Sequence, residues 1–464
     1  MKLLRRLVLV PSLVLTLVSS SFGQDVESRL KTLEDTTKAQ QQKIEEQQRL
    51  IEELKSSSGG ASAPVAAGTV ARPTPREPGQ PTTAVQEGTT AKLTGIFGGS
   101  AMTNPYISLI VNTFFYHSDL KQSELDSSTI PGFTNVPLGT RRGFNLESAE
   151  LFVFAPVDPY LNLYANIPVT ESGTELEEAY FVTSSLPAGL QVKGGKFKSG
   201  FGRINAQHPH AWDFVDAPLN YRAFMGTEGM GGEKGIQLTW LPDLPIYLQL
   251  GIEALQGEND QLFGAGAKDG PHAFTVFAKT SMEIGDSGTI LIGPSFAKGK
   301  ANIPTVADNT TFTGDTDLFG FEMVYKWKPS RDRGFILQSE YLYRRQAGDL
   351  RTGDVADPAS TVATLTRAQD GIYVQGLYQV GRWRLGARYD VLDLLKKDFI
   401  LSGTQQDLGK QPWRATGALE FNPSEFTRIR LQYSRDESSR DGKANNELYF
   451  QMQMGIGAHA AHSF

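Results

Sequence analysis

The chain has 464 residues, 39% of them hydrophobic, and a formal net charge of −6 at pH 7. Nucleic-acid partners require concentrated positive charge, so no nucleic-acid partner is expected. The absence of cysteine excludes disulfides, thiolate catalysis and cysteine-ligated zinc. Beyond the N-terminus no apolar run approaches the ~20 residues of a spanning helix, which excludes helical membrane proteins.

The first residues predict export. Basic residues as far as Arg6, an apolar run from Leu7 to Val18 and small residues up to Gly23 are the three parts of a secretory signal peptide. We therefore interpret residues 1–23 as a signal peptide. No cysteine follows the apolar run, so a lipoprotein is not expected.

A heptad repeat follows in residues 24–55. Its seam positions are spaced alternately by four and three, at Val26, Leu30, Leu33, Thr37, Gln40, Ile44, Gln47, Ile51 and Leu54. A lone helix of this length is marginal in water, so we expect the stripe to meet copies of itself in a periplasmic coiled coil. A polar single helix or a disordered spacer is the alternative.

Residues 56–103 have the composition of a linker. They are rich in Ser, Gly, Ala, Thr and Pro and have no apolar periodicity. Such a segment cannot bury enough apolar surface to fold, so we predict that it is disordered.

From residue 104 to residue 464 the hydrophobic period is two, in segments of about ten to fourteen residues. One example is the alternation of Trp383, Leu385, Ala387 and Tyr389 with Arg384, Gly386, Arg388 and Asp390. These segments are long for a soluble sheet and match tilted strands that cross a bilayer. The predicted fold class is all-β, a transmembrane antiparallel β-barrel of about 16 strands preceded by a short α-helical coiled coil.

The predicted strands start near residues 106, 142, 158, 175, 189, 234, 245, 271, 287, 316, 333, 367, 383, 409, 425 and 446. Their connections alternate between tight turns and mostly longer polar loops, as periplasmic turns and external loops do in outer-membrane barrels. The last strand places an aromatic residue, Phe464, on its lipid side, which is a signal for the outer-membrane assembly machinery. A soluble β-sandwich or β-helix, the alternative, should show shorter strands and no sidedness of loops.

Basic side chains share the predicted inner face. The expected pore-lining residues are Lys193, Arg203, Arg222, Lys326, Arg384, Arg388, Arg428 and Arg430. Positive charge in a narrow aqueous lumen concentrates anions and repels cations. Alternatively, acids and bases pair across neighbouring strands and only line a wet wall.

One cluster has the residue types of a metal site. His208, His210 and Asp213 lie close together in a predicted loop, and two histidines with a carboxylate can chelate zinc. Such residues more often fix a loop by hydrogen bonds, and no metal is assigned. Glu177 and Glu178 are consecutive and would point to opposite faces of a strand, so they cannot act as an acid/base pair. No Gly-x-Ser-x-Gly motif is present, and no enzyme activity is expected.

Three stretches resemble outer-membrane porins related to the phosphate-selective (O/P-type) porins. They are residues 104–108 (NPYIS), residues 195–203 (GKFKSGFGR) and residues 208–214 (HPHAWDF). The resemblance implies a sixteen-stranded channel, a homotrimer, whose third external loop, here residues 200–233, folds inward and narrows the pore. This loop mixes Arg203 and Arg222 with acidic residues, which departs from the basic constriction of phosphate-selective members.

The expected function is therefore passive diffusion of small hydrophilic solutes or ions through the cell outer membrane, with a weak anion preference and no cofactor. The expected partners are outer-membrane lipid and lipopolysaccharide, the assembly machinery and the permeating solutes. The alternative is a non-conducting barrel that acts as a structural tether for the coiled coil.

Overall fold

The computed structural model describes residues 105–133, 140–227, 229–305, 309–353, 357 and 359–457. The predicted signal peptide, coiled coil and linker, and also Phe464, lie outside the described residues. Among the helices of the described part, none is long and apolar enough to cross a membrane.

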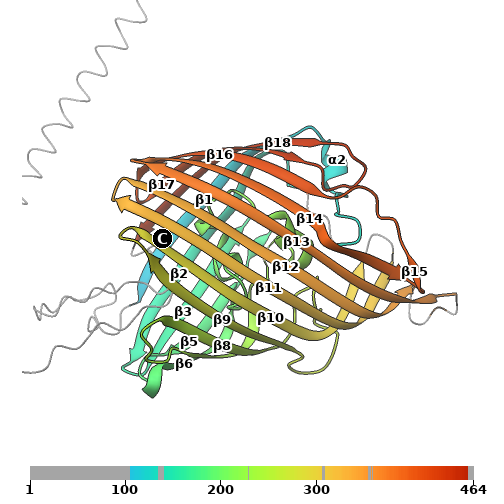
Figure 1. Ribbon diagram of the computed structural model, residues 1–464, viewed down its shortest axis with the longest axis horizontal. Coiled ribbons are helices and arrows are strands. Elements are labelled where there is room, and N and C mark those ends of the chain that lie inside the picture. The colour runs from blue at the N-terminus through green and yellow to red at the C-terminus, as the bar shows by residue number, and fades with distance from the viewer. Residues whose placement is uncertain are drawn as a thin grey trace, which may run out of the picture. The chain divides into compact units, whose positions relative to one another are not determined.

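Within the described residues, sixteen strands of six or more residues form one closed antiparallel sheet (Figure 1). In chain order they are β1 (Tyr106–Ser118), β2 (Gly143–Asp158), β3 (Leu161–Thr170), β5 (Glu178–Thr183), β6 (Leu190–Phe197), β7 (Glu233–Trp240), β8 (Tyr247–Leu255), β9 (Ala273–Ile284), β10 (Gly288–Thr305), β11 (Thr310–Ser330), β12 (Arg333–Thr352), β13 (Thr361–Val380), β14 (Trp383–Leu401), β16 (Trp413–Ser424), β17 (Thr427–Asp436) and β18 (Asn445–Gly457). Two-residue strands extend the sheet at β4 (Gly173–Thr174) and β15 (Thr404–Gln405). Asn112 of β1 pairs with both Ser148 of β2 and Gln453 of β18, so the ring has no free edge.

Helical segments are short and lie in the connections. In the part of the chain that the structure describes, the α-helices are α2 (Gln122–Leu125) and α3 (Leu219–Met225), and the 3₁₀ turns are η2 (Pro187–Gly189), η3 (Ile204–Ala206) and η4 (Pro209–Ala211).

The sequence-based strand pattern is confirmed. Each predicted start lies within six residues of an observed one, and the largest offsets occur at Thr310 and Thr361. The tight turns and the longer loops alternate around the ring as predicted, except between β10 and β11, where the predicted loop 300–315 is largely strand and only residues 306–309 connect the two. A soluble sandwich is wrong for this chain because its sheet closes on itself.

Strands β10 to β14 are longer than expected. They run for 18 to 21 residues, against the roughly ten to fourteen that the alternation indicated. At the ends of β10, β11 and β13 farthest from the tight turns, Ile303, Phe312 and Leu365 pack together in a small core. This packing stabilises the extended parts of these strands. Their sequence alone did not predict them as strands, because polar residues surround the buried apolar ones.

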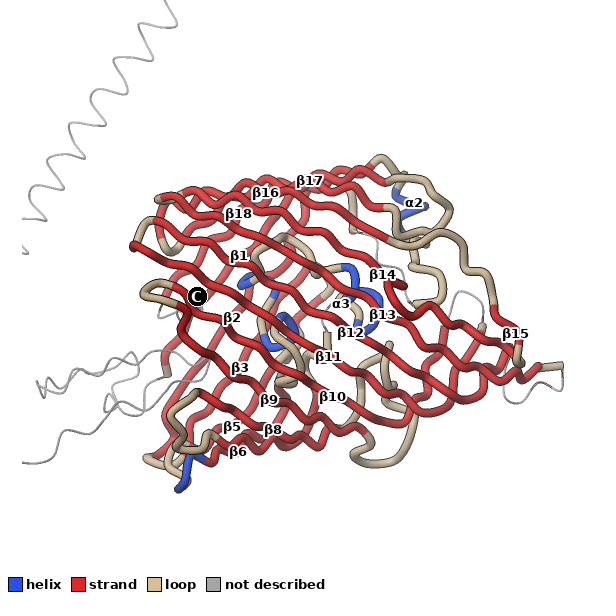
Figure 2. The backbone as a smooth tube through the Cα atoms, viewed as in Figure 1, coloured by secondary structure: helices blue, strands red, loops and turns tan. Residues whose placement is uncertain are grey.

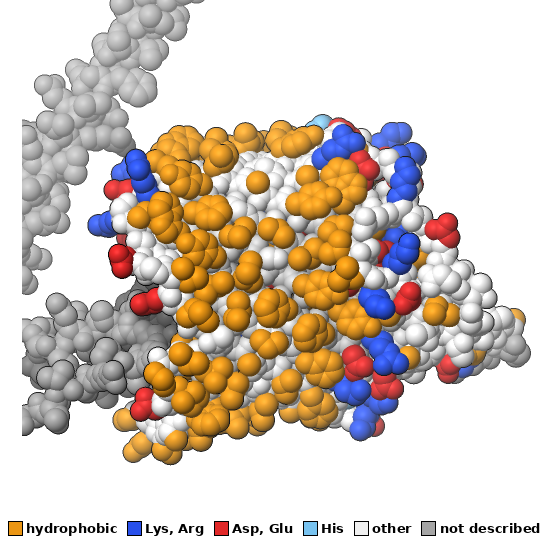
Figure 3. Space-filling view, in the orientation of Figure 1, with side chains coloured by type: hydrophobic (Ala, Val, Ile, Leu, Met, Phe, Trp, Pro, Cys, Tyr) orange, Lys and Arg blue, Asp and Glu red, His pale blue; other side chains and the backbone are white. Residues whose placement is uncertain are grey.

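Apolar side chains cover the outside of the barrel, and charged ones are buried inside it. On β14, Leu385 and Tyr389 are 63% and 51% exposed, whereas Arg388 and Asp390 are 3% and 0% exposed. Figure 3 shows one outer face of the barrel, where hydrophobic side chains form a belt and charged ones gather at its two ends. A soluble protein has the reverse arrangement, so the belt is a lipid-facing surface.

The barrel encloses the loop between β6 and β7, residues 198–232, called L3 below. Figure 2 shows α3, which belongs to L3, within the ring of strands, and α3 contacts β12, β13 and β14. Pro218 precedes the first helical residue, and Gly226, whose φ is 85°, ends the helix.

Candidate functional site: the barrel interior

Buried carboxylates of the wall hold the backbone of L3. Glu253 of β8 accepts a hydrogen bond from the Gly200 N–H at 2.7 Å. Glu340 of β12 accepts bonds from the N–H groups of Arg203 and Ile204, at 2.8 and 3.1 Å. Carboxylates of the wall thus accept hydrogen bonds from backbone N–H groups of L3, which water would accept if the loop were exposed.

A second set of bonds fixes the middle of L3. Asp213 and Asp216 of L3 form ion pairs with Arg384 at 2.6 Å and with Arg388 at 3.0 Å. Asp216 also pairs with Arg414 of β16. Burial raises the pKa of the Asp216 carboxyl, but the two guanidinium groups beside it outweigh burial and hold that pKa below its usual range.

An apolar contact closes one side of the interior. Phe201, Leu219 and Phe224 of L3 are fully buried in the same cluster as Leu342 and Leu392 of the wall. L3 therefore packs against the β10–β14 side without an aqueous gap at these residues.

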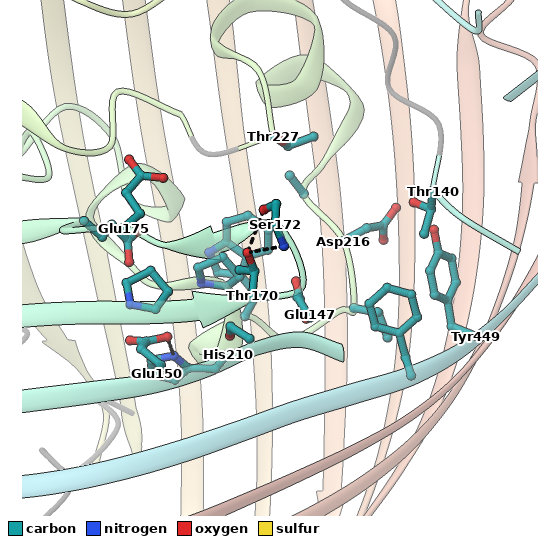
Figure 4. Close-up of a pocket in the computed structure, with 18 of the residues that line it drawn as sticks. Thr140, Glu147, Glu150, Thr170, Ser172, Glu175, His210, Asp216, Thr227 and Tyr449 are labelled. Atoms are coloured by element: carbon teal, nitrogen blue, oxygen red, sulfur yellow. Dashed lines mark hydrogen bonds and ion pairs between the residues drawn. The ribbon is translucent and has the colours of Figure 1, made fainter. Parts of the chain in front are cut away.

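The opposite side of L3 contains a cavity of about 600 Å³, called the first cavity. Its walls come from L3 and from β1, β2, β3 and β18 (Figure 4). Five carboxylates line it, Glu147, Glu150, Glu175, Glu177 and Asp216, against the basic side chains of His210 and Arg222. The lining is therefore acidic.

A second cavity of about 340 Å³ lies under the loop between β1 and β2. Arg222 of α3 lines both cavities, so this side chain stands where they approach each other. The second lining is acidic too, with Glu124, Asp436, Asp441 and Glu447 against Arg222 and Lys443. Two acidic cavities therefore follow the inside of the wall past α3.

The two histidines of L3 lie beside the first cavity. Their rings stack with centroids 5.4 Å apart. His208 contacts Glu177 through Nδ1 at 3.2 Å and Glu178 through Nε2 at 2.8 Å, and His210 contacts Glu150 at 2.8 Å. Burial lowers the pKa of His208, but these carboxylates outweigh it and raise the pKa to about 10.

The structure separates the residues proposed as a metal site. His208 and His210 lie together among carboxylates, whereas Asp213 pairs with Arg384. Glu177 and Glu178 do not point to opposite faces of a strand as expected, because β5 begins only at Glu178 and both carboxylates reach His208. The prediction for this pair was wrong because it took both residues as strand.

The predicted pore-lining bases lie inside the barrel or in L3. Arg384, Arg388 and Arg430 are buried in ion pairs, and Arg428 donates to the carbonyl of His210 at 3.0 Å. The Nζ of Lys193 lies 5.3 Å from the centre of the Tyr180 ring. The remaining three are Arg203, which donates to Gln338 at 3.0 Å, Arg222 at the two cavities, and Lys326, half-buried on β11.

Sequence reasoning missed most of the acids at the first cavity. Strict alternation puts Glu147 and Glu150 on opposite faces of β2, but the pairing of β2 with β1 skips Glu147, which lies at a bulge. Glu150 shares its face with Ser148 and Phe152. That parity places Glu150 inside the barrel. It cannot show that Glu150 meets L3, because the contact joins residues 60 positions apart.

Comparisons with known proteins give a fold likeness and one sequence relative. No protein-family model matches the sequence. The chain is similar to in-vitro folded OmpT, an outer membrane protein of Vibrio cholerae, with 11% identity, coverage of 77% of this chain and 99% of that one, and a TM-score of 0.47. It is also similar to an anion-selective porin from Comamonas acidovorans, with 9% identity, coverage of 76% and 100%, and a TM-score of 0.49.

The sequence relative is an uncharacterized protein of Aquifex aeolicus (strain VF5). The two chains are 40% identical over 385 residues, which is 78% of this chain and 80% of the relative. This chain therefore belongs to the same protein family as that Aquifex aeolicus protein.

Proposed function

We propose that this protein is an outer-membrane channel through which small hydrophilic solutes and ions diffuse passively. The observation that carries the proposal is a pair of cavities that share Arg222 inside a lipid-facing barrel, one between L3 and the wall and the other under the loop between β1 and β2. Diffusion needs an aqueous path and no reacting groups. We accordingly propose neither a catalytic role nor a cofactor for transport.

L3 forms the constriction in this proposal. It excludes water on the β10–β14 side, where Leu219 and Phe224 are buried, and leaves the cavities on the other side. The sequence favoured a weak anion preference because many bases face inward. Asp213 and Asp216 pair with Arg384 and Arg388, and with Asp216 left out the cavity linings still hold more acids than bases. We therefore propose a preference for cations.

The long-loop end faces the cell exterior in this proposal. Lys298 and Lys300 lie at that end of β10, with 59% and 57% of their side chains exposed, in ion pairs with Asp317 and Asp315. Basic side chains just beyond an apolar belt suit the phosphate groups of lipopolysaccharide. Two expectations remain predictions from the sequence: insertion by the outer-membrane assembly machinery, and a coiled coil in the periplasm.

We propose that the barrel is a homotrimer whose subunits meet on the side of the short strands. Strands β5, β6 and β7 have six, eight and eight residues, fewer than the roughly nine to eleven needed to cross a bilayer. The exposed apolar residues Phe181 and Ile236 lie on this side. A neighbouring subunit covers such a wall better than lipid does.

Chemical cross-linking of the detergent-solubilised chain tests this assembly. A covalent trimer is expected, and recovery of the monomer alone refutes the proposal.

Single-channel recording in planar lipid bilayers tests the transport function. A pore gives stable conductance steps, and in a tenfold KCl gradient the reversal potential should take the sign of cation selectivity. Folded barrels that insert without conductance would instead support a structural tether for the N-terminal segment.

Arg222 provides a sharper version of this experiment. Arg222→Gln removes the base common to both cavities, so the reversal potential should move further toward the cation limit. Arg331→Gln, in the exposed turn between β11 and β12, is the matched control and should leave it unchanged. Equal reversal potentials for both variants would place the ion path elsewhere.

A further inference from the structure

Four side chains converge where L3 meets the wall beside the first cavity. They are Glu150 of β2, Asn166 of β3, Glu177 of the loop before β5 and His208 of L3. The Nδ1 atom of His208 lies 3.2 Å from Glu177 Oε2 and 3.5 Å from Glu150 Oε1. Zinc bonds of about 2.0–2.2 Å make the edge of a tetrahedral ligand set roughly 3.3–3.6 Å. Both distances therefore suit zinc ligands.

Asn166 supplies an independent sign of a cation site. Its side-chain nitrogen lies close to three polar atoms at once: Glu150 Oε1 at 2.7 Å, Glu177 Oε2 at 2.9 Å and His208 Nδ1 at 3.0 Å. An amide nitrogen carries only two hydrogens, so it cannot satisfy all three. Asn166 is 1% exposed, and its Oδ1 has no hydrogen-bond partner among the described residues. Rotation of the amide by 180° directs this oxygen into the cluster as a fourth ligand.

Three of these side chains, His208, Glu150 and Glu177, each have a further partner that orients them. Glu178 contacts His208 Nε2 at 2.8 Å, so Zn²⁺ would bind at Nδ1 and displace the proton there. His210 contacts the second oxygen of Glu150 at 2.8 Å, and Lys198 contacts the second oxygen of Glu177 at 2.6 Å. Supporting partners of this kind orient the ligands of metal sites and fix the histidine tautomer.

Charge and access also fit a divalent ion. Glu150, Glu177 and Glu178 with Lys198 leave two net negative charges when both histidines are neutral, and one divalent cation balances them. The donor set of imidazole nitrogen and carboxylate oxygen suits zinc better than calcium or magnesium, which take oxygen ligands. Glu150 and Glu177 line the first cavity, so an ion reaches them from water.

We propose that Glu150, Asn166, Glu177 and His208 bind one Zn²⁺ ion, which joins the beginning of L3 to strands β2 and β3. The site differs from the set suggested by the sequence. His208 is a ligand, His210 positions Glu150, and Asp213 belongs to the ion pair with Arg384. This inference does not depend on transport, because a non-conducting barrel would carry the same site.

Calorimetric titration of the untagged full-length chain, stripped with EDTA and held in detergent, tests the site. ZnCl₂ should bind with a stoichiometry of one per chain, and excess Mg²⁺ should not compete. His208→Ala and Glu177→Gln should each lower zinc affinity at least tenfold. His117→Ala, an exposed histidine at the end of β1, is the matched control and should bind as the unchanged protein does.

A second readout separates lost ligands from lost folding. Glu178→Gln keeps all four ligands and should weaken zinc binding roughly 10- to 100-fold, while the circular dichroism of the barrel stays the same. Co²⁺ bound in place of Zn²⁺ should give visible absorption bands that His208→Ala abolishes. A folded barrel that takes up no zinc, or that binds it equally well in the His208→Ala variant, overturns the proposal.

Discussion

Glu340 should be the strongest single attachment between L3 and the wall, and Glu340→Gln tests this. The carboxylate is 1% exposed and accepts four hydrogen bonds. Oε2 accepts from the Arg203 N–H at 2.8 Å and the Tyr221 hydroxyl at 2.5 Å. Oε1 accepts from the Ile204 N–H at 3.1 Å and the Tyr373 hydroxyl at 2.7 Å.

Glutamine retains one acceptor oxygen, and its NH₂ group faces the other pair of donors, a backbone N–H and a tyrosine hydroxyl. The hydroxyl can turn and accept from the NH₂ group, but the backbone N–H cannot. The variant therefore loses one hydrogen bond to a charged acceptor, worth about 1.5–3 kcal/mol. We expect the free energy of unfolding to fall by roughly 1.5–3 kcal/mol if L3 remains in place, and by less if L3 detaches and its donors reach water.

Urea unfolding of the barrel in lipid vesicles measures the change, and limited proteolysis reports release of L3. The control is Glu283→Gln, the same substitution at an exposed position on β9. Glu340→Gln should also increase current fluctuations, because a loosened L3 moves within the constriction. The argument fails if both variants unfold within ~1 kcal/mol of each other and L3 resists protease equally in both, since a lost bond to a charged acceptor costs more than that.

Three further perturbations follow from the structure. Leu431→Arg places a charge at an exposed position of the apolar belt and should lower the free energy of unfolding by about 2–4 kcal/mol, which folding titrations in vesicles measure; a neutral effect would mean that this position does not face lipid. Gly202→Ala should destabilise L3 by roughly 1–3 kcal/mol, because φ is 63° and the new Cβ would lie 2.5 Å from the Tyr221 hydroxyl oxygen and 2.6 Å from Glu340 Oε2; proteolysis of L3 at the unchanged rate would contradict it. The pKa of Asp216 is lower in the folded chain than in the unfolded one, so its ion pairs contribute fully above about pH 4 and are lost only as the pH falls through the folded value. Fluorescence of Trp212, also in L3, should therefore stay constant down to about pH 4. A fluorescence change above that pH that is absent from the Asp216→Asn variant would contradict this expectation.

The strand pattern could be predicted because it is a local property of the sequence. Side chains on a strand alternate with a period of two, so residues such as Arg384 and Leu385 reveal their faces without knowledge of the partner strand. The alternation of short and long connections then determines an even number of strands with both ends on one side. Strand length was less accessible, since the extension of β10 to β14 depends on contacts such as that of Ile303 with Phe312 and Leu365.

The charge of the lumen depended on the tertiary structure. The sequence places Arg384 and Arg388 on the inner face, but only the folded loop brings Asp213 and Asp216 to them and leaves acidic cavities on the other side. The same holds for His208, whose partners Glu150 and Glu177 come from separate segments of the chain. The sequence by itself therefore determined the barrel, because strand alternation is set residue by residue. The tertiary structure decided the interior, because contacts between distant segments set which charges are paired and which face water.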